Sequence, residues 1–147
     1  MGVLMISEKI AEAIFTFTQE DKSDLSCFYG LNIDYKNESI ISSAKLAESG
    51  DIYEGIERLI ESDLTLIWDT VAFTTEGWCK PVDTGDDTPP SKHPLKQRVI
   101  LTVIVNKEKE FHAVMKIENG EILHDTSGRG PLADHAQKLY PLKMENF

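Results

Sequence analysis

The sequence predicts an α+β fold in a single domain, residues 1–147, with a mainly antiparallel sheet of about five strands flanked by helices. Apolar residues recur at helical spacing in three segments, and runs rich in β-branched and aromatic residues lie between these segments. The elements follow the order α-β-β-α-β-β-β-α, which suits an antiparallel sheet with helices packed against it. A length of 147 residues is typical of one domain, and 41% hydrophobic residues can supply its core.

The first predicted helix begins after Ser7, a residue type that caps helices, and it ends in the polar stretch 19–26. Two β-prone runs then flank the polar residues 36–38 within the segment 27–43, which predicts a β-hairpin. The apolar positions of the first helix are Ile6, Ile10, Ala13, Ile14 and Phe17.

A second helix is predicted at the pair Asp51 and Glu54, whose spacing resembles a capping box. Gly50 directly precedes the pair and separates the helix from the hairpin. The apolar face of this helix consists of Ile52, Ile56, Leu59 and Ile60.

Three further strands are predicted from their composition. LTLIWDTVAFTT, which begins at Leu64, is apolar on both faces, as is RVILTVIV at 98–105, so both are expected to be covered on two sides. FHAVMKI at 111–117 is the next strand, and Asn119-Gly120 is a typical hairpin turn before a short last strand.

Asp69 lies inside the first of these apolar strands, next to Trp68. A buried carboxylate without a partner is costly, so Asp69 must reach solvent or accept hydrogen bonds. Two interpretations stay open: a strand bulge or polar edge, and an acid or base with a tuned pKa.

The net charge of −10 is unevenly distributed along the chain. Residues 1–69 hold 14 acidic and 5 basic residues, a balance of −9, whereas residues 70–147 hold 11 acidic and 10 basic residues, a balance of −1. Phosphate contacts need clustered Lys and Arg, so the sequence argues against nucleic-acid binding. The acidic half is expected to be a solvated helix surface, and the alternative is an acidic surface that docks on a basic partner or mimics nucleic acid.

The start of the chain, MGVLMISEK, lacks the basic segment and the cleavage site of a secretion signal. We therefore expect a cytoplasmic protein in which Cys27 and Cys79 are both reduced. The sequence contains no apolar run of about 18 residues, so no association with a membrane is expected.

Four histidines, His93, His112, His124 and His135, could supply metal ligands together with Asp125, but they follow no recognised ligand spacing and HExxH is absent. GxSxG is also absent, which argues against a serine hydrolase. The sequence therefore predicts no metal and no cofactor. It names no catalytic residue and favours a protein that is not an enzyme.

A long loop at 76–97 is the first candidate for a functional site, because long connections in compact domains are usually functional or mobile. Trp78 is expected to pack against the sheet or the last helix and to form part of an interaction surface. Arg98 could hold a phosphate or carboxylate with its planar guanidinium, whereas charge compensation by nearby aspartates is the alternative. The basic cluster at the end of this loop consists of Lys92, His93, Lys96 and Arg98.

The segment HDTSGRGP at 124–131 is the second candidate. Gly128 and Gly130 allow unusual backbone angles, and Pro131 opens a last helix, whose N-terminus favours anions. This turn and the basic cluster are expected to form one anion-accepting corner, with plain turn chemistry and salt bridges as the alternative. The expected ligand contacts of the turn are Asp125, Ser127 and Arg129.

Three segments, TTEGWCKP, PSKHPLKQRV and GPLADHAQKLY, resemble a loose set of small uncharacterised proteins of actinobacteria and their phages. The shared pattern is Thr-Gly-Trp near a strand end and Ser-x-His-Pro before a basic strand start, within residues 64–140. Here Glu76 falls between the Thr and the Gly, and Cys79 and Lys80 replace small residues. The set carries no established activity, so the resemblance implies a phage or mobile-element setting and no functional residue. The element order also resembles that of roadblock and profilin-like folds, which are mostly binding scaffolds.

These observations predict a small acidic binding or accessory protein of the cytoplasm that acts through a protein partner or through self-association. The first alternative is a binder of a small anionic ligand such as a nucleotide, with a hydrolase as its rarer variant. The second alternative is a structural component of a phage particle.

Overall fold

The structure is a computed structural model of the protein. Of residues 78, 79 and 131 the structure describes only the backbone. The residues that it describes are 6–20, 25–62, 67–79, 92, 94, 97–128 and 131–140.

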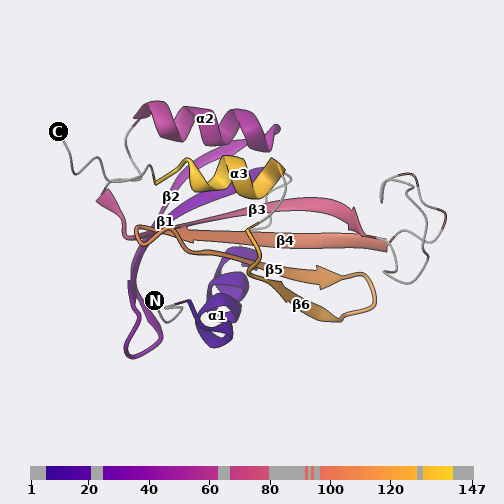
Figure 1. Ribbon diagram of the computed structural model, residues 1–147, viewed down its shortest axis with the longest axis horizontal. Coiled ribbons are helices and arrows are strands. Elements are labelled where there is room, and N and C mark those ends of the chain that lie inside the picture. Colours follow the sequence, from indigo (N-terminus) through magenta and orange to yellow (C-terminus); the bar gives the residue numbers. More distant parts are fainter. Residues whose placement is uncertain are drawn as a thin grey trace.

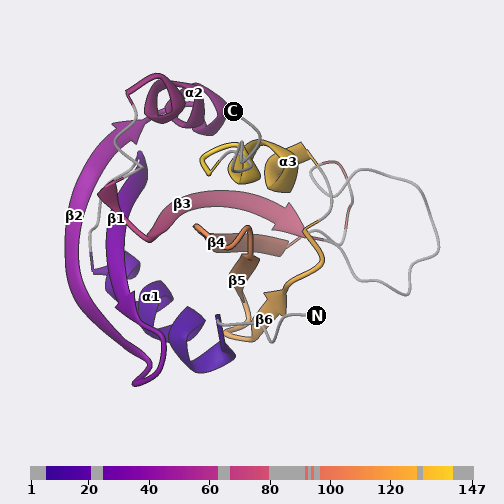
Figure 2. The same cartoon turned by 60° about the vertical axis from the view of Figure 1, so that its left-hand side comes forward.

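An antiparallel sheet of six strands forms the centre of the described chain, in the order β2-β1-β3-β4-β5-β6 (Figure 1). Helix α1 packs on one face of the sheet, whereas α2 and α3 pack on the other face (Figures 1 and 2). The predicted α+β fold is therefore confirmed, and the short last strand makes the sixth. The elements are α1 Glu8–Gln19, β1 Ser26–Asp34, β2 Ser39–Ser49, α2 Ile52–Ser62, β3 Thr70–Cys79, β4 Gln97–Asn106, β5 Phe111–Ile117, β6 Ile122–Asp125 and α3 Pro131–Gln137.

Each face of the sheet has its own hydrophobic core, because side chains of a strand alternate between the two faces. Under α2 and α3, Phe28 and Phe73 pack with their ring centroids 5.2 Å apart, and both are fully buried. Under α1, Ile14 packs with Leu31 and Ile104, which are also fully buried. Burial of one such side chain stabilises a fold by about 1.5–3 kcal/mol, so both layers are held mainly by apolar contacts.

Helix α1 begins as predicted, because the Ser7 hydroxyl accepts a hydrogen bond of 3.1 Å from the main-chain N–H of Ile10. Its buried face is rotated from the predicted one, since Ala13 is exposed and Phe17 is half-buried. The buried residues of α1 are Ile10, Ala11, Ile14, Phe15 and Thr18.

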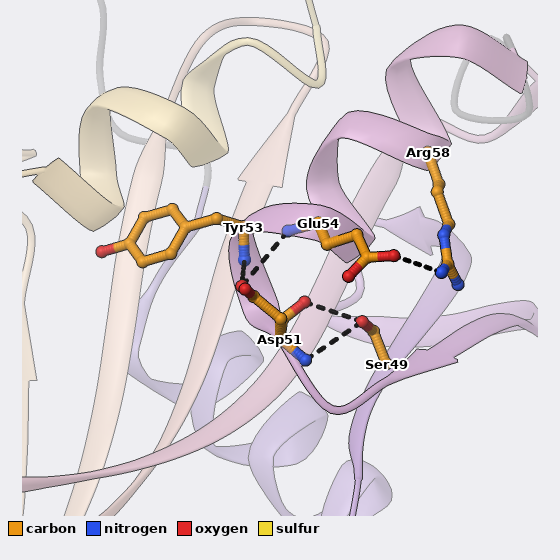
Figure 3. Close-up of polar contacts among 5 residues, drawn as sticks. All are labelled: Ser49, Asp51, Tyr53, Glu54 and Arg58. Carbon is orange, nitrogen blue, oxygen red and sulfur yellow. Dashed lines mark hydrogen bonds and ion pairs between the residues drawn. The ribbon is translucent and has the colours of Figure 1, made fainter.

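Helix α2 begins at the predicted cap, but only half of the predicted capping box forms (Figure 3). The Asp51 carboxylate accepts hydrogen bonds from the main-chain N–H groups of Tyr53 at 2.9 Å and of Glu54 at 3.3 Å. The Glu54 carboxylate pairs with Arg58 and does not return to Asp51. The main-chain N–H of Asp51 donates instead to the Ser49 hydroxyl at 3.2 Å. Ser49 thus takes the role that Glu54 has in a complete box.

Strand β3 differs from its prediction at both ends, because it begins at Thr70 and not at Leu64, and it continues to Cys79. The Asp69 carboxylate accepts the main-chain N–H of Ile33 at 3.2 Å, so a side chain takes the place of a strand partner there. Residues 76–79, predicted to open the long loop, pair with β4. The connection between the two strands is therefore shorter than the predicted loop at 76–97.

The indole of Trp68 lies directly over the backbone of β1. A Cβ atom added at Gly30 would be 2.4 Å from the Trp68 ring, which is closer than any real contact of a Cβ. The Tyr140 hydroxyl donates to the Trp68 carbonyl at 2.8 Å and helps to fix this residue. Gly30 is thus required by the close approach of a ring to the strand.

Within the described residues, no helix combines the length and the apolar character needed to cross a membrane.

Candidate functional site

A hollow lies on the α1 face of the sheet, where β3, β4 and β5 extend beyond the helix (Figure 1). Its volume is about 520 Å³, which lies within the range of small-ligand sites. We call this site the α1-end hollow. Its lining residues are Phe15, Thr16, Gln19, Glu76, Arg98, Ile100, Lys116, Ile117 and Glu118.

Sheet register places the central side chains of the α1-end hollow in one row. Glu76 of β3 pairs with Ile100 of β4, and Ile100 pairs with Lys116 of β5. Residues paired in this way point to the same face, so an isoleucine lies between an acidic and a basic side chain. Ile100 is 37% exposed, which leaves an apolar floor open to a binding partner.

Arg98, predicted to hold an anion, lies at the rim of this hollow and already pairs with Glu76. Both side chains are more than half exposed, so the pair contributes only about 0–1 kcal/mol to stability and can open at little cost. The backbone of Arg98 is better fixed. Its N–H donates to the Glu118 carboxylate at 3.1 Å, and its carbonyl accepts the N–H of Glu118 at 3.0 Å.

The α1-end hollow therefore presents two cationic and two anionic side chains around apolar residues. Its formal charge is balanced, in contrast to the chain as a whole, which carries −10. Such a surface can exchange its Arg98–Glu76 ion pair for ion pairs with a bound molecule that has charges of both signs.

The structure does not bring Arg98 together with the described members of the second predicted site. Asp125 pairs with Ala113, which pairs with Val103, five residues further along β4 than Arg98. At ~3.4 Å per residue this offset is roughly 17 Å along the strand. The expected anion corner is therefore not formed by Arg98 and Asp125, because β6 runs back along β5 and away from the Arg98 end of the sheet. Asp125 instead accepts the main-chain N–H of Ser127 at 2.8 Å, which is plain turn chemistry.

The remaining predicted site residues are either exposed or lie outside the part of the chain that the structure describes. Lys92 is exposed, and Ser127 is exposed in the turn after β6. His93, Lys96, Arg129 and the side chain of Trp78 lie outside the described residues, so their predicted roles stay predictions.

Sequence analysis missed Glu76, Ile100, Lys116 and Glu118 as site residues. A signal for Lys116 was present, because it is a charged residue inside the apolar strand FHAVMKI. Its meaning depends on strand register, which decides the side chains beside it.

Asp69 belongs to a polar network at the opposite end of β3. The Thr70 hydroxyl donates to the Asp69 carboxylate at 2.7 Å, and the Tyr35 hydroxyl lies 2.5 Å from the Thr70 oxygen. Asn106 donates its side-chain N–H to the Tyr35 oxygen at 3.3 Å. Burial raises the pKa of Tyr35, which keeps this phenol neutral as a donor. Because the Asp69 carboxylate is occupied by Ile33 and Thr70, this geometry favours the polar-edge interpretation over an acid or base.

A second polar chain runs from the sheet to α1. His112 of β5 is 2% exposed, and its Nε2 lies 2.8 Å from Nδ1 of His124 on β6. The Nε2 of His124 lies 2.9 Å from a carboxylate oxygen of Glu12. Burial, followed by the neighbouring His124, lowers the pKa of His112, so its ring is held in the neutral form.

Comparisons of the chain with protein-family models, with curated proteins and with solved structures found no match.

Proposed function

We propose that this chain is a small acidic binding protein that acts through a protein partner, and that the α1-end hollow holds an extended segment of that partner. The observation that carries the proposal is the open apolar floor at Ile100 between side chains of opposite charge. The occupant is a short segment with one apolar side chain for the floor and charged side chains of both signs beside it. The Arg98–Glu76 pair opens to receive those charges.

Charge and size support a protein segment over nucleic acid. A nucleic-acid backbone would meet a net charge of −10, and the hollow presents as many acidic as basic side chains. A volume of about 520 Å³ holds a few side chains and not a folded domain. The proposal places the protein in the cytoplasm, and the resemblance to phage-related proteins favours a mobile-element setting.

A selection from a displayed library of random peptides tests the proposal. The wild-type chain should enrich a shared peptide pattern, and Ile100→Glu should lose the selected peptides, because a carboxylate would replace the apolar floor. Ile41→Glu is the matched control, since Ile41 is 68% exposed on the distant strand β2. Selected peptides that bind wild type and both variants equally, or a selection that enriches nothing, would contradict the proposal.

The second candidate is a small anionic ligand such as a nucleotide, with a hydrolase as the rarer variant. This candidate is favoured because Arg98 and Lys116, which are both cationic, line the α1-end hollow. Titration with a nucleotide, followed by chemical-shift changes, separates the two candidates. Shifts that centre on β4 and β5 and vanish in the double variant Arg98→Ala with Lys116→Ala support the small ligand. Absence of shifts together with peptide binding supports the protein segment.

The third candidate function is that of a phage-particle component, and this function requires the chain to self-associate. Light scattering of the purified chain measures this directly. A monomer at high concentration argues against it, whereas a defined large assembly would favour it over both other candidates.

A further inference from the structure

We propose that Glu8, Glu12 and His124 form a binding site for a divalent metal ion of the zinc class. One ligand atom from each side chain lies within 4.8 Å of the other two. Glu8 and Glu12 are four residues apart in α1, so they project from the same side of the helix. His124 comes from β6, and its Nε2 lies 2.9 Å from the Glu12 carboxylate.

The spacing of these atoms suits one ion. Zinc binds histidine nitrogen at about 2.0–2.1 Å and carboxylate oxygen at about 2.0–2.2 Å, so in a tetrahedral arrangement two of its ligand atoms lie roughly 3.4 Å apart. Both glutamates are exposed, so their side chains are free to rotate toward this spacing. His124 is more restricted, since its side chain is 14% exposed.

An independent observation comes from the buried histidine behind the site. His112 is 2% exposed, and its Nε2 lies 2.8 Å from Nδ1 of His124, the ring nitrogen that faces away from the glutamates. In metal sites, a ligand histidine is oriented through its second ring nitrogen by a fixed hydrogen-bond partner. His112 supplies such a partner for His124.

The His112 ring is buried, and the main chain of Ile6, just before α1, interacts with it as well. The orientation of this imidazole is therefore fixed by its surroundings, which leaves Nε2 directed at His124. With an ion on Nε2 of His124, the N–H at Nδ1 of His124 donates to Nε2 of His112. The geometry therefore supports His112 as the residue that positions the His124 ligand.

The donor set selects the class of ion. Zinc binds both imidazole nitrogen and carboxylate oxygen, and three protein ligands leave its fourth coordination position open. Magnesium and calcium prefer sets made only of oxygen and take more ligands. Bound zinc would join α1 to the edge strand β6 at the place where Glu12 and His124 already lie side by side.

Calorimetric titration of the full chain with zinc chloride tests the site, with magnesium and calcium chloride in parallel. We expect one equivalent of zinc to bind and to raise the melting temperature, and the other two ions to bind at least tenfold more weakly. The double variant Glu8→Gln with Glu12→Gln should weaken zinc binding at least tenfold. Its matched control is Glu57→Gln with Glu61→Gln, which removes the same charge from two exposed positions four residues apart in α2.

Metal binding by the histidines can be measured separately, because cobalt bound to imidazole nitrogen has a visible absorption spectrum. His124→Gln should abolish this spectrum, and His135→Gln on α3 should leave it unchanged. His112→Gln should weaken zinc binding about 10–100-fold if it orients the ligand. Since His112 is buried, the exposed single variant Glu12→Gln gives an answer even if His112→Gln fails to fold. Zinc affinity that is equal in the α1 and α2 double variants, or no zinc binding by the wild type, would overturn the proposal.

Discussion

The two faces of the sheet bury different kinds of side chain. Under α2 and α3 the core cluster consists of aliphatic and aromatic residues, and its one hydroxyl, of Tyr140, donates to a main-chain carbonyl. The α1 face also buries an apolar cluster, but hydrogen-bonded polar residues lie beside it. These polar residues are Thr18, Thr70, Thr102, Asn106 and His112, whereas Ser49 is the buried polar residue at α2.

This difference distinguishes the apolar residues that stabilise the fold from the polar residues that could support a binding site. Apolar packing stabilises without direction, whereas buried polar groups require particular partners and fix a geometry. Both candidate sites, the α1-end hollow and the Glu8–Glu12–His124 cluster, lie at α1. The apolar clusters of both faces are thus expected to govern stability, and the α1 face is expected to govern function as well.

The largest expected effect is on the α2/α3 face. Phe73→Ala should lower the free energy of unfolding by about 3–5 kcal/mol, because Phe73 is fully buried and packs on Phe28. Chemical denaturation followed by fluorescence measures this loss. Ile100→Ala on the α1 face is the comparison, and it should cost much less because Ile100 is 37% exposed. Equal losses in the two variants would show that the floor of the α1-end hollow belongs to the stabilising core and is not free for binding.

The next effect tests the polar interior under α1. The Thr18 hydroxyl donates to the Phe15 carbonyl at 2.8 Å, so the Thr102 hydroxyl donates to Thr18 across 2.8 Å. Thr102→Val should lower the free energy of unfolding by about 1–2 kcal/mol, since a buried hydrogen bond is lost at constant shape.

The double variant Thr18→Val with Thr102→Val should cost less than the sum of the two single variants, because neither hydroxyl is then left without its partner. Additive losses in a double-mutant cycle would show that the two hydroxyls do not interact. Such a result would make the α1 face energetically similar to the α2/α3 face.

Much of the fold was predictable because its signals are local. The Ser7 cap, the Asp51 cap and the turn between β1 and β2 follow from residue types at fixed spacing. The start of β3 was missed because LTLIW continues the apolar pattern of the strand. The strand begins at Thr70 because Asp69 is joined to β1 through side chains: its carboxylate accepts the main-chain N–H of Ile33, and its own N–H donates to the Asn32 side chain.

The site was less predictable because it depends on register. Arg98 was identified from its charge, but its neighbours Glu76 and Lys116 are 22 and 18 residues away in the sequence. The cluster of Glu12 and His124 joins residues 112 positions apart. No short motif encodes contacts between residues so far apart in the sequence. The sequence therefore favoured an anion-binding corner formed by Arg98 and Asp125, which does not form.

A smaller effect is expected at the start of α2. Asp51→Ala should lower the free energy of unfolding by about 1 kcal/mol, because two main-chain N–H groups lose their acceptor. Ser49→Ala should cost a similar amount if Ser49 completes the cap as its hydrogen bonds indicate. A loss near that of Phe73→Ala would mean that α2 is held by its cap more than by packing. Thermal unfolding of the three variants side by side decides between these outcomes.

The smallest effect is expected in the α1-end hollow. Arg98→Ala should change the free energy of unfolding by less than about 1 kcal/mol, because its side chain and that of Glu76 are more than half exposed. A double-mutant cycle between Arg98→Ala and Glu76→Ala measures their coupling, and the exposed pair of Glu54 and Arg58 on α2 provides the reference. A coupling as weak as that reference, and weaker still at high salt, means that these charges contribute little to the fold and are free to serve a bound molecule. A coupling well above about 1 kcal/mol would instead make the pair part of the stabilising framework. The ion pair of the α1-end hollow would then contribute to stability as the α2/α3 face does. A weak coupling would no longer support the assignment of this hollow as a binding surface.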